Sequence, residues 1–236
     1  MHRSAKRLAS LLACTAVPVM LVAGCSGSDT NSSGDSSDAP SKSSSPSPTV
    51  AAAKFQKLPK PCQVFSKDTL HKLVPKTKDK SGDQGDSPDS SAHGTCHWES
   101  SDEQGVDGTQ FRWLDIGLQR YDSDPNPKVG SGEQRAAIFY TKQITEAKGT
   151  KGAKKLETAK TSGTGDEATA VTYSLKKDGS PSTKTTVVAR TANIVVTINY
   201  NGWGLAGADA PKAADLLKKA QAAAKEAVSA AVKANG

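Results

Sequence analysis

Histidines are the side chains best suited to acid–base chemistry near neutral pH. Beyond the N-terminal region the chain has His71, His93 and His97. A serine hydrolase would set one of them beside a serine in a Gly-x-Ser-x-Gly turn, and the sequence contains no such motif. We therefore predict surface or structural roles for the histidines and no catalytic residue.

Two groups of carboxylates have spacings that could suit ion binding or proton transfer. Asp83, Asp86 and Asp89 recur at every third position, but they lack the central glycine and terminal glutamate of a calcium loop. Asp166 and Glu167 are adjacent within a Gly-Asp-Glu-Ala stretch, which favours a turn into a strand over a paired-carboxylate site. We predict neither a cofactor nor a metal site.

Tryptophans could line a binding cleft in a chain with only 5% aromatic residues. Trp98 follows Cys96 by two residues and is expected in the core. Trp113 alternates with polar residues on a predicted strand, whereas Trp203 lies between two glycines, as in a loop before the last helix. Trp113 and Trp203 are the candidates for a binding rim, with core filling as the alternative for Trp203.

The N-terminal 24 residues have the parts of a secretory signal: basic residues, an apolar stretch and small residues at the end. The apolar stretch contains Pro18 and is too short for a comfortable membrane span. Val22-Ala23-Gly24-Cys25 resembles the lipobox of bacterial lipoproteins. That resemblance implies that residues 1–24 are a signal peptide and that Cys25 becomes the acylated first residue of the mature protein.

Residues 25–54 are rich in Ser, Gly and Pro and contain almost nothing that a core could bury. Ordering such a stretch costs backbone entropy without compensation by hydrophobic burial. We predict a disordered tether between the lipidated Cys25 and a globular domain over residues 55–236.

Two cysteines, Cys62 and Cys96, remain once Cys14 in the signal and Cys25 are set aside. Exported proteins fold in an oxidising compartment, so these two most simply form a disulfide. Closing that loop should contribute about 3–4 kcal/mol. A metal or redox site built from the cysteines and the nearby histidines is the alternative, and the lack of a Cys-x-x-Cys motif argues against it.

The first half of the domain predicts two helices and two strands. A short helix begins after Ser66 and ends before Pro75, followed by a long polar loop over 76–94. Strands are expected at 95–100 and at 109–121, and in the second of these apolar and polar residues alternate. A helix is expected at 133–148, because Ser131 and Gln134 form a capping-box pattern at its start.

The second half predicts a meander of strands and a closing helix. Strands are expected at 154–158, 168–176, 183–190 and 193–200, with turns at Asp178-Gly179-Ser180-Pro181 and at Ala192-Asn193. Residues 209–233 carry an alanine-rich apolar stripe opposite lysines, which suits packing on a sheet better than insertion into lipid. The predicted fold is α+β: a single domain with an antiparallel sheet, two main helices, a short N-terminal helix and one disulfide.

Charge patterning gives no sign of nucleic-acid binding. The formal net charge is +7, and about +4 remains after loss of the three cations of the signal. Lysines and acids are interspersed along the chain instead of forming a basic stripe.

The order of motifs resembles a family of actinobacterial secreted lipoproteins built on a domain of unknown function. The motifs are Pro61-Cys62, Cys96-His97-Trp98 and Gly165-Asp166-Glu167-Ala168, followed by the alanine-rich helix. The layout over residues 58–233 is also similar to extracellular sensor domains of mycobacterial receptor kinases, except for the long polar loop at 76–94. The resemblance implies a ligand-binding or interaction role and brings no catalytic residues.

Together these patterns predict a non-enzymatic lipoprotein on the extracytoplasmic face of the cell membrane. Its partners are the membrane, through the diacylglyceryl anchor, and an envelope ligand or protein. Two alternatives remain open: an envelope hydrolase whose active site lacks a known motif, and a passive structural envelope protein.

Overall fold

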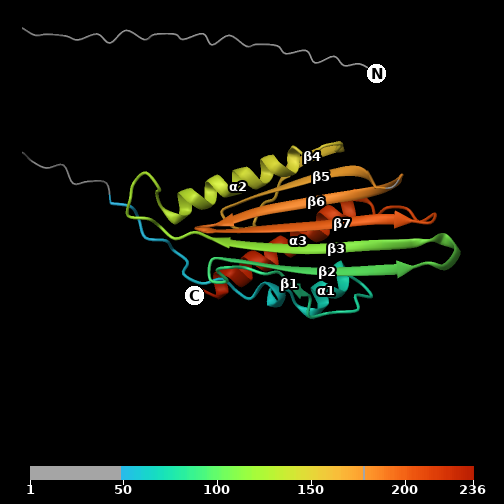
Figure 1. Cartoon of the computed structure of the whole chain (residues 1–236), viewed down its shortest axis with the longest axis horizontal. Helices are drawn as coiled ribbons and strands as arrows, with labels where there is room; N and C mark the ends of the chain where they lie inside the picture. The colour runs from blue at the N-terminus through green and yellow to red at the C-terminus, as the bar shows by residue number, and fades with distance from the viewer. Residues whose placement is uncertain (1–48, 178) are drawn as a thin grey trace, which may run out of the picture. The chain divides into compact units, whose positions relative to one another are not determined.

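A single antiparallel sheet organises the domain in the computed structural model, which describes residues 49–177 and 179–236 (Figure 1). The predicted signal peptide, the predicted lipidation site Cys25 and most of the predicted tether lie outside the described residues. Within the described residues seven strands pair in the order β1-β2-β3-β7-β6-β5-β4, all antiparallel. The α+β prediction is confirmed.

The elements follow one another as the sequence predicted, with a few additions. The strands are β1 (Asp83–Gln84), β2 (His93–Glu103), β3 (Thr109–Arg120), β4 (Lys154–Lys160), β5 (Glu167–Lys177), β6 (Ser180–Thr191) and β7 (Ile194–Leu205). The helices are α1 (Lys67–Leu73), α2 (Gly132–Lys148) and α3 (Ala213–Lys233), with short 3-10 turns η1 (Pro61–Gln63) and η2 (Gly105–Asp107).

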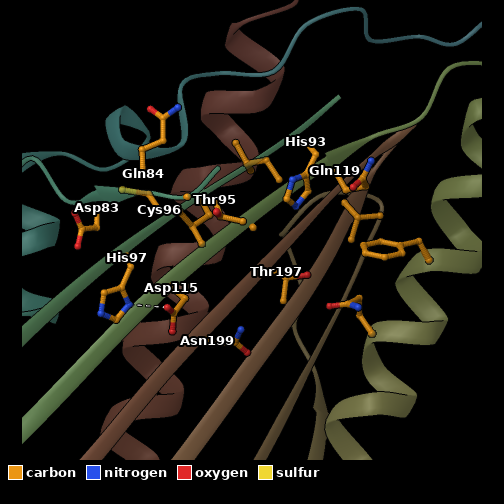
Figure 2. Close-up of a pocket in the computed structure, with 17 residues that line it drawn as sticks. Asp83, Gln84, His93, Thr95, Cys96, His97, Asp115, Gln119, Thr197 and Asn199 are labelled. Carbon is orange, nitrogen blue, oxygen red and sulfur yellow. Dashed lines mark hydrogen bonds and ion pairs between the residues drawn. The ribbon is translucent and has the colours of Figure 1, made fainter. Parts of the chain in front are cut away.

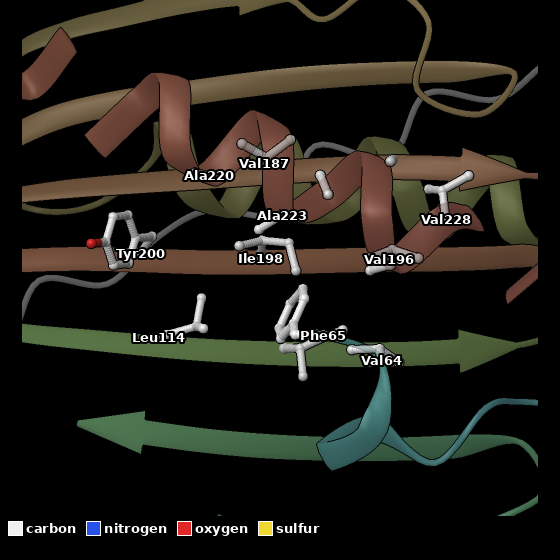
Figure 3. Close-up of a cluster of buried hydrophobic side chains, with 14 of the residues drawn as sticks. Val64, Phe65, Leu114, Val187, Val196, Ile198, Tyr200, Ala220, Ala223 and Val228 are labelled. Carbon is white, nitrogen blue, oxygen red and sulfur yellow. The ribbon is translucent and has the colours of Figure 1, made fainter. Parts of the chain in front are cut away.

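One face of the sheet is covered by α3, which lies across β5, β6 and β7 (Figure 1). The alanines on its inner side are fully buried, and Figure 3 shows Ala220 and Ala223 facing Val187 and Ile198 of the sheet. Because alanine has a single methyl group, the helix backbone can approach the strands closely along its whole length. The alanine stripe is therefore a core-packing face, as predicted.

The opposite face is covered only in part, by α2. The helix begins at the predicted capping box, in which the Ser131 hydroxyl accepts from the Gln134 N–H and the Gln134 side chain accepts from the Ser131 N–H. Its inner side packs Ala136 and Tyr140 on Val188 and Val195. Over most of β2 and β3 this face is not covered by a helix.

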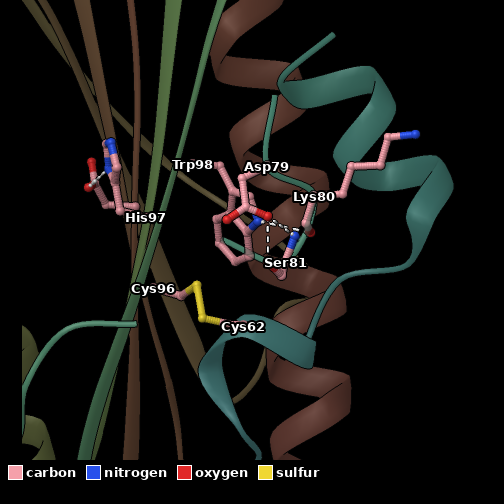
Figure 4. Close-up of a disulfide and its surroundings, with 8 residues drawn as sticks. Cys62, Asp79, Lys80, Ser81, Cys96, His97 and Trp98 are labelled. Atoms are coloured by element: carbon pink, nitrogen blue, oxygen red, sulfur yellow. Dashed lines mark hydrogen bonds and ion pairs between the residues drawn. A yellow bond between two sulfur atoms is a disulfide. The ribbon is translucent and has the colours of Figure 1, made fainter. Parts of the chain in front are cut away.

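The disulfide between Cys62 and Cys96 is confirmed (Figure 4). It joins η1 to β2 beside Trp98, which is buried and donates its indole N–H to the carbonyl of Lys80 at 3.4 Å. Gly82 passes so close that a Cβ there would lie 2.5 Å from the Trp98 ring, and its φ is +76°. Only glycine fits both constraints, so the polar loop is held against this corner of the core.

Several predicted boundaries were wrong, among them those of the polar loop and of the last helix. Residues 76–94 are not all loop, because β1 adds a two-residue strand to β2, and β2 itself begins at His93. The last helix begins at Ala213 and not at 209, because Pro211 and its neighbours cross the sheet in an extended path before the first helical turn. The outer edge strand β4 is exposed and carries three lysines, which protect a sheet edge against pairing with other chains.

No helix among residues 49–177 and 179–236 combines the length and the apolar character needed to cross a membrane.

Two asparagines fix the point where the chain enters the domain. Asn193, fully buried in the β6–β7 turn, accepts from the Phe55 N–H and donates to the carbonyls of Phe55 and Tyr121, each at 2.8 Å. Asn235, after α3, binds the exposed backbone of Gln56 and Lys57. The N-terminal segment is thereby tied to both the sheet and the last helix.

We expect Asn193→Ala to lower the free energy of unfolding by about 2–4 kcal/mol, because two buried backbone groups of Phe55 and the part-buried carbonyl of Tyr121 lose their partner. Asn235→Ala should cost about 1 kcal/mol or less, since water reaches the groups it leaves. Urea denaturation of the two variants measures the difference. Equal losses of unfolding free energy in the two variants would show that burial of the Asn193 amide does not account for its contribution to stability.

Tyr200 is the one buried tyrosine on the α3 face of β7, and its hydroxyl donates to the Leu73 carbonyl at the end of α1. Burial raises the pKa of Tyr200 to about 12, from its usual 10.0. The folded state therefore holds this proton more tightly than the unfolded chain. The resulting stabilisation is fully present below pH 10 and is lost as the pH rises from 10 through about 12.

Tyr200→Phe should flatten this alkaline loss. Lysines also titrate in that range in both proteins, so the informative quantity is the difference in slope of unfolding free energy against pH. Urea midpoints between pH 9 and 12 give the two slopes. Parallel curves for wild type and variant would contradict the assigned role of the phenol.

Candidate functional site

The partly covered face of the sheet holds a groove of about 760 Å³, shown in Figure 2. We call it the sheet groove. Its floor is made by alternate residues of β2, β3 and β7, and its walls by Asp83 of β1 on one side and Phe139 and Gln143 of α2 on the other. The floor residues that concern us are Thr95, His97, Asp115, Gly117, Thr197 and Asn199.

A row of polar side chains crosses the floor from strand to strand. His97, Asp115, Asn199 and Thr186 occupy directly paired positions on β2, β3, β7 and β6. The His97 Nδ1 and an Asp115 carboxylate oxygen are 2.6 Å apart, and the Thr186 hydroxyl donates to the Asn199 amide oxygen at 2.8 Å. Paired strand positions on one face hold side chains about 4.5–5.5 Å apart, so the row is fixed by the ladder itself.

The His97–Asp115 pair is only partly shielded from water, with 36% and 42% of the two side chains exposed. The carboxylate fixes the ring orientation and leaves the other ring nitrogen, Nε2, for a further contact. In the described part of the chain, no serine, threonine or cysteine side chain hydrogen-bonds to His97. The arrangement is suited to binding through hydrogen bonds and lacks the nucleophile contact of a hydrolytic triad.

The next rows along the strands complete the floor. Thr95, Gly117 and Thr197 form the second row, and Gly117 leaves it open, because a Cβ at that position would find its nearest neighbour, the Thr197 Cβ, 3.9 Å away. Gln119, in the third row, donates to the carbonyls of Ala92 and Arg120. A larger residue at Gly117 would therefore project into the groove without a clash in the sheet.

Three aromatic side chains, the aromatic layer, continue the same face beyond the polar row. Phe111, Trp113 and Trp203 have ring centroids 5.7, 5.5 and 6.3 Å apart and interplanar angles of 13°, 28° and 24°. Rings stacked in one column would have one centroid distance twice the others. Nearly equal distances between nearly parallel rings instead describe one cluster in which each ring stacks, with an offset, on the other two.

Trp203 lies in β7, and its predicted place in a loop is wrong. Its neighbours Gly202 and Gly204 are also part of the strand, and the segment before α3 crosses directly over both. Only glycine fits there, because a Cβ on Gly202 would lie 2.5 Å from Pro211 Cγ and one on Gly204 2.0 Å from the Ala208 carbonyl oxygen. The glycines permit close approach between backbones. The structure thus brings the two predicted rim residues, Trp113 and Trp203, side by side, and both are half-buried.

The remaining candidates have structural roles. Trp98 is in the core, as predicted. Asp166 and Glu167 do not form a paired-carboxylate site, because both bind Arg190, and Asp166 also accepts from the Ala192 N–H at 2.6 Å. The Gly-Asp-Glu-Ala stretch therefore braces the β6–β7 turn. His71 lies on the exposed side of α1.

Metal binding finds no support in the described residues, where no three His, Cys, Asp or Glu side chains come together in a way that could hold an ion. Asp83, Asp86 and Asp89 are exposed, as solvated loop carboxylates are.

Comparison with known proteins gives little further information. No family model and no curated protein sequence matches the chain. Among solved structures, the chain is similar to LpqN, which is described as involved in cell envelope biogenesis of Mycobacterium tuberculosis. The identity is 16% and the TM-score 0.30, over 61% of this chain and 82% of LpqN. We infer neither fold nor function from a similarity of this size.

Sequence reasoning missed the polar row that forms the centre of the groove. His97 and Asp115 each stood on a predicted strand, but the register that pairs them depends on the whole β2–β3 hairpin. The available signal was the period-two alternation of β3, which placed Asp115 on the same side as Trp113.

Proposed function

We propose that this chain is a lipid-anchored, non-catalytic binding protein of the cell envelope whose ligand occupies the sheet groove. The observation that carries the proposal is the contrast between the two sheet faces. One face is closed by α3, while the other presents a groove of about 760 Å³ lined by fixed polar side chains. Ligand sites are typically concave and largely pre-formed, with a few oriented polar groups.

A binding role fits the site better than catalysis. The one hydrogen-bonded acid–base pair in the groove, His97 with Asp115, has no nucleophile hydrogen-bonded to it among the described residues. The alternative of a passive structural protein gives no reason for the polar row, since solvated polar side chains need no ordered cross-strand pairing.

The position of the chain entry suits a tethered binding domain. Phe55 is held by Asn193 in the β6–β7 turn. Trp203 comes ten residues after Asn193 and lies near the far end of β7. At about 3.4 Å per residue the two points are about 30 Å apart. An anchor at Cys25 would thus connect to one end of the sheet and leave the aromatic layer at the other.

Gly117→Phe tests the groove. The phenyl ring should fill the floor and abolish ligand retention, while stability changes little because the Cβ meets no close neighbour. Full-length protein extracted from the envelope of its producing cell is examined by native mass spectrometry for a retained small molecule. Thr158→Phe, on the exposed edge strand β4 and outside the groove, is the matched control.

Wild type and Thr158→Phe should carry the added mass, and Gly117→Phe should not. The proposal fails if Gly117→Phe, folded as judged by its unfolding midpoint, retains the same molecule. It also fails if wild type carries none.

The anchor is tested by Cys25→Ala. Without the thiol, no diacylglycerol can be attached, and the protein should leave the membrane fraction for the soluble fraction of the producing cell. Cys14→Ala, within the predicted signal peptide, should leave the distribution unchanged. Membrane retention of Cys25→Ala equal to that of wild type would refute lipid anchoring at this residue.

A further inference from the structure

We propose that the ligand is a neutral glycan that lies along the sheet, with its sugar rings on the aromatic layer and its hydroxyl groups on the polar row. This inference rests on the proposed function and names the class of ligand. The observation behind it is that the aromatic layer and the polar row are continuous. On β3, Trp113 comes two residues before Asp115, and on β7, Asn201 comes two residues after Asn199, so each pair shares one face of its strand.

The aromatic layer matches the apolar side of a sugar. A pyranose ring presents a flat face of C–H bonds, which packs on an aromatic plane, while its hydroxyl groups point outward around the rim. Phe111, Trp113 and Trp203 form one cluster of nearly parallel, half-buried rings that spans two adjacent strands. The Lys184 ammonium lies over the Trp113 ring, 5.8 Å from its centroid, and brings a hydrogen-bond donor to the layer.

The polar row matches the hydroxyl rim. Carboxylate, amide and imidazole groups present planar pairs of donors or acceptors, and Asp115, Asn199 and His97 bring all three kinds to neighbouring strands. Each is held by another side chain: His97 and Asp115 by one another, and Asn199 by Thr186. Hydroxyl groups, which both donate and accept, can bond to every member of such a row.

The charges favour a neutral ligand over an anionic one. The groove is lined by the carboxylates of Asp83 and Asp115 and by two histidines, with no lysine or arginine among the lining residues. Asp115 shares a hydrogen bond with His97, and no cationic side chain from Lys or Arg lines the groove beside the carboxylates of Asp83 and Asp115. A phosphate or fatty-acid carboxylate would enter a site of its own sign.

The length of the surface suits an oligomer. From Phe111 to Gln119 the same face of β3 extends over about 27 Å, at about 3.4 Å per residue. Several sugar units can therefore contact the protein at once, first the aromatic layer and then the polar rows.

The test uses full-length protein in detergent, titrated with neutral oligosaccharides released from the envelope of the producing cell. Tryptophan fluorescence reports binding, because Trp113 and Trp203 lie in the layer while Trp98 is buried in the core. We expect Trp113→Leu to weaken binding about tenfold or more, as loss of a tryptophan anchor does. Trp113→Tyr, which restores an aromatic plane at the same position, should bind within about threefold of wild type.

Phe111→Leu is the second variant, since it keeps an apolar side chain but removes a plane, and it should also weaken binding. Unfolding midpoints identify any variant that has lost its fold. Wild-type affinity in folded Trp113→Leu and Phe111→Leu would overturn the inference.

The native mass spectrometry described above separates the two proposals. A retained molecule that contains no sugar, such as a lipid or a peptide, and that is lost in Gly117→Phe would refute the glycan and leave the binding function standing. A retained molecule built of hexose units, lost in the same variant, would support both.

Discussion

The alternation of β3 and β7 is the constraint on which the rest of the structure depends. Every second residue, from Leu114 to Leu118 and from Ile194 to Tyr200, is fully buried against the α3 side. The residues between them must then face the other way, because a strand has a period of two. The apolar half of each strand thus determines not only the core but also the position of every side chain in the groove.

Because α3 packs tightly on one face of the sheet, the sheet is stable even though its other face is only partly covered. The alanines of α3 bring the helix axis close to β6 and β7, glycines let the preceding segment cross β7, and Asn193 satisfies the buried backbone at the chain entry. These contacts give the sheet a complete core on one side. The α2 helix then needs to cover only the end near Val188 and Val195, and the region over β2 and β3 is left for a ligand.

The sequence was sufficient for features that local chemistry determines. The capping box at Ser131 and Gln134, the turn at Ala192-Asn193 and the Cys62–Cys96 disulfide follow from side-chain chemistry or from counting, and they were predicted. The cross-strand pairs were not, because register is a property of two strands together. Trp203 was misplaced for a related reason: its flanking glycines suggested a loop, whereas they are required by the backbone that crosses over them.

A site built on strands has consequences for binding that a loop site lacks. The floor residues belong to strands that are paired on both sides, so their backbones are already ordered before a ligand arrives. Ordering flexible groups on binding costs about 0.5–1.5 kcal/mol for each side chain immobilised. Mutual contacts such as His97 with Asp115 meet part of that cost during folding. The same register that sequence inspection could not supply is therefore what prepares the groove for its ligand, and a slip of one residue in β2 would turn His97 toward the core and remove it from the site.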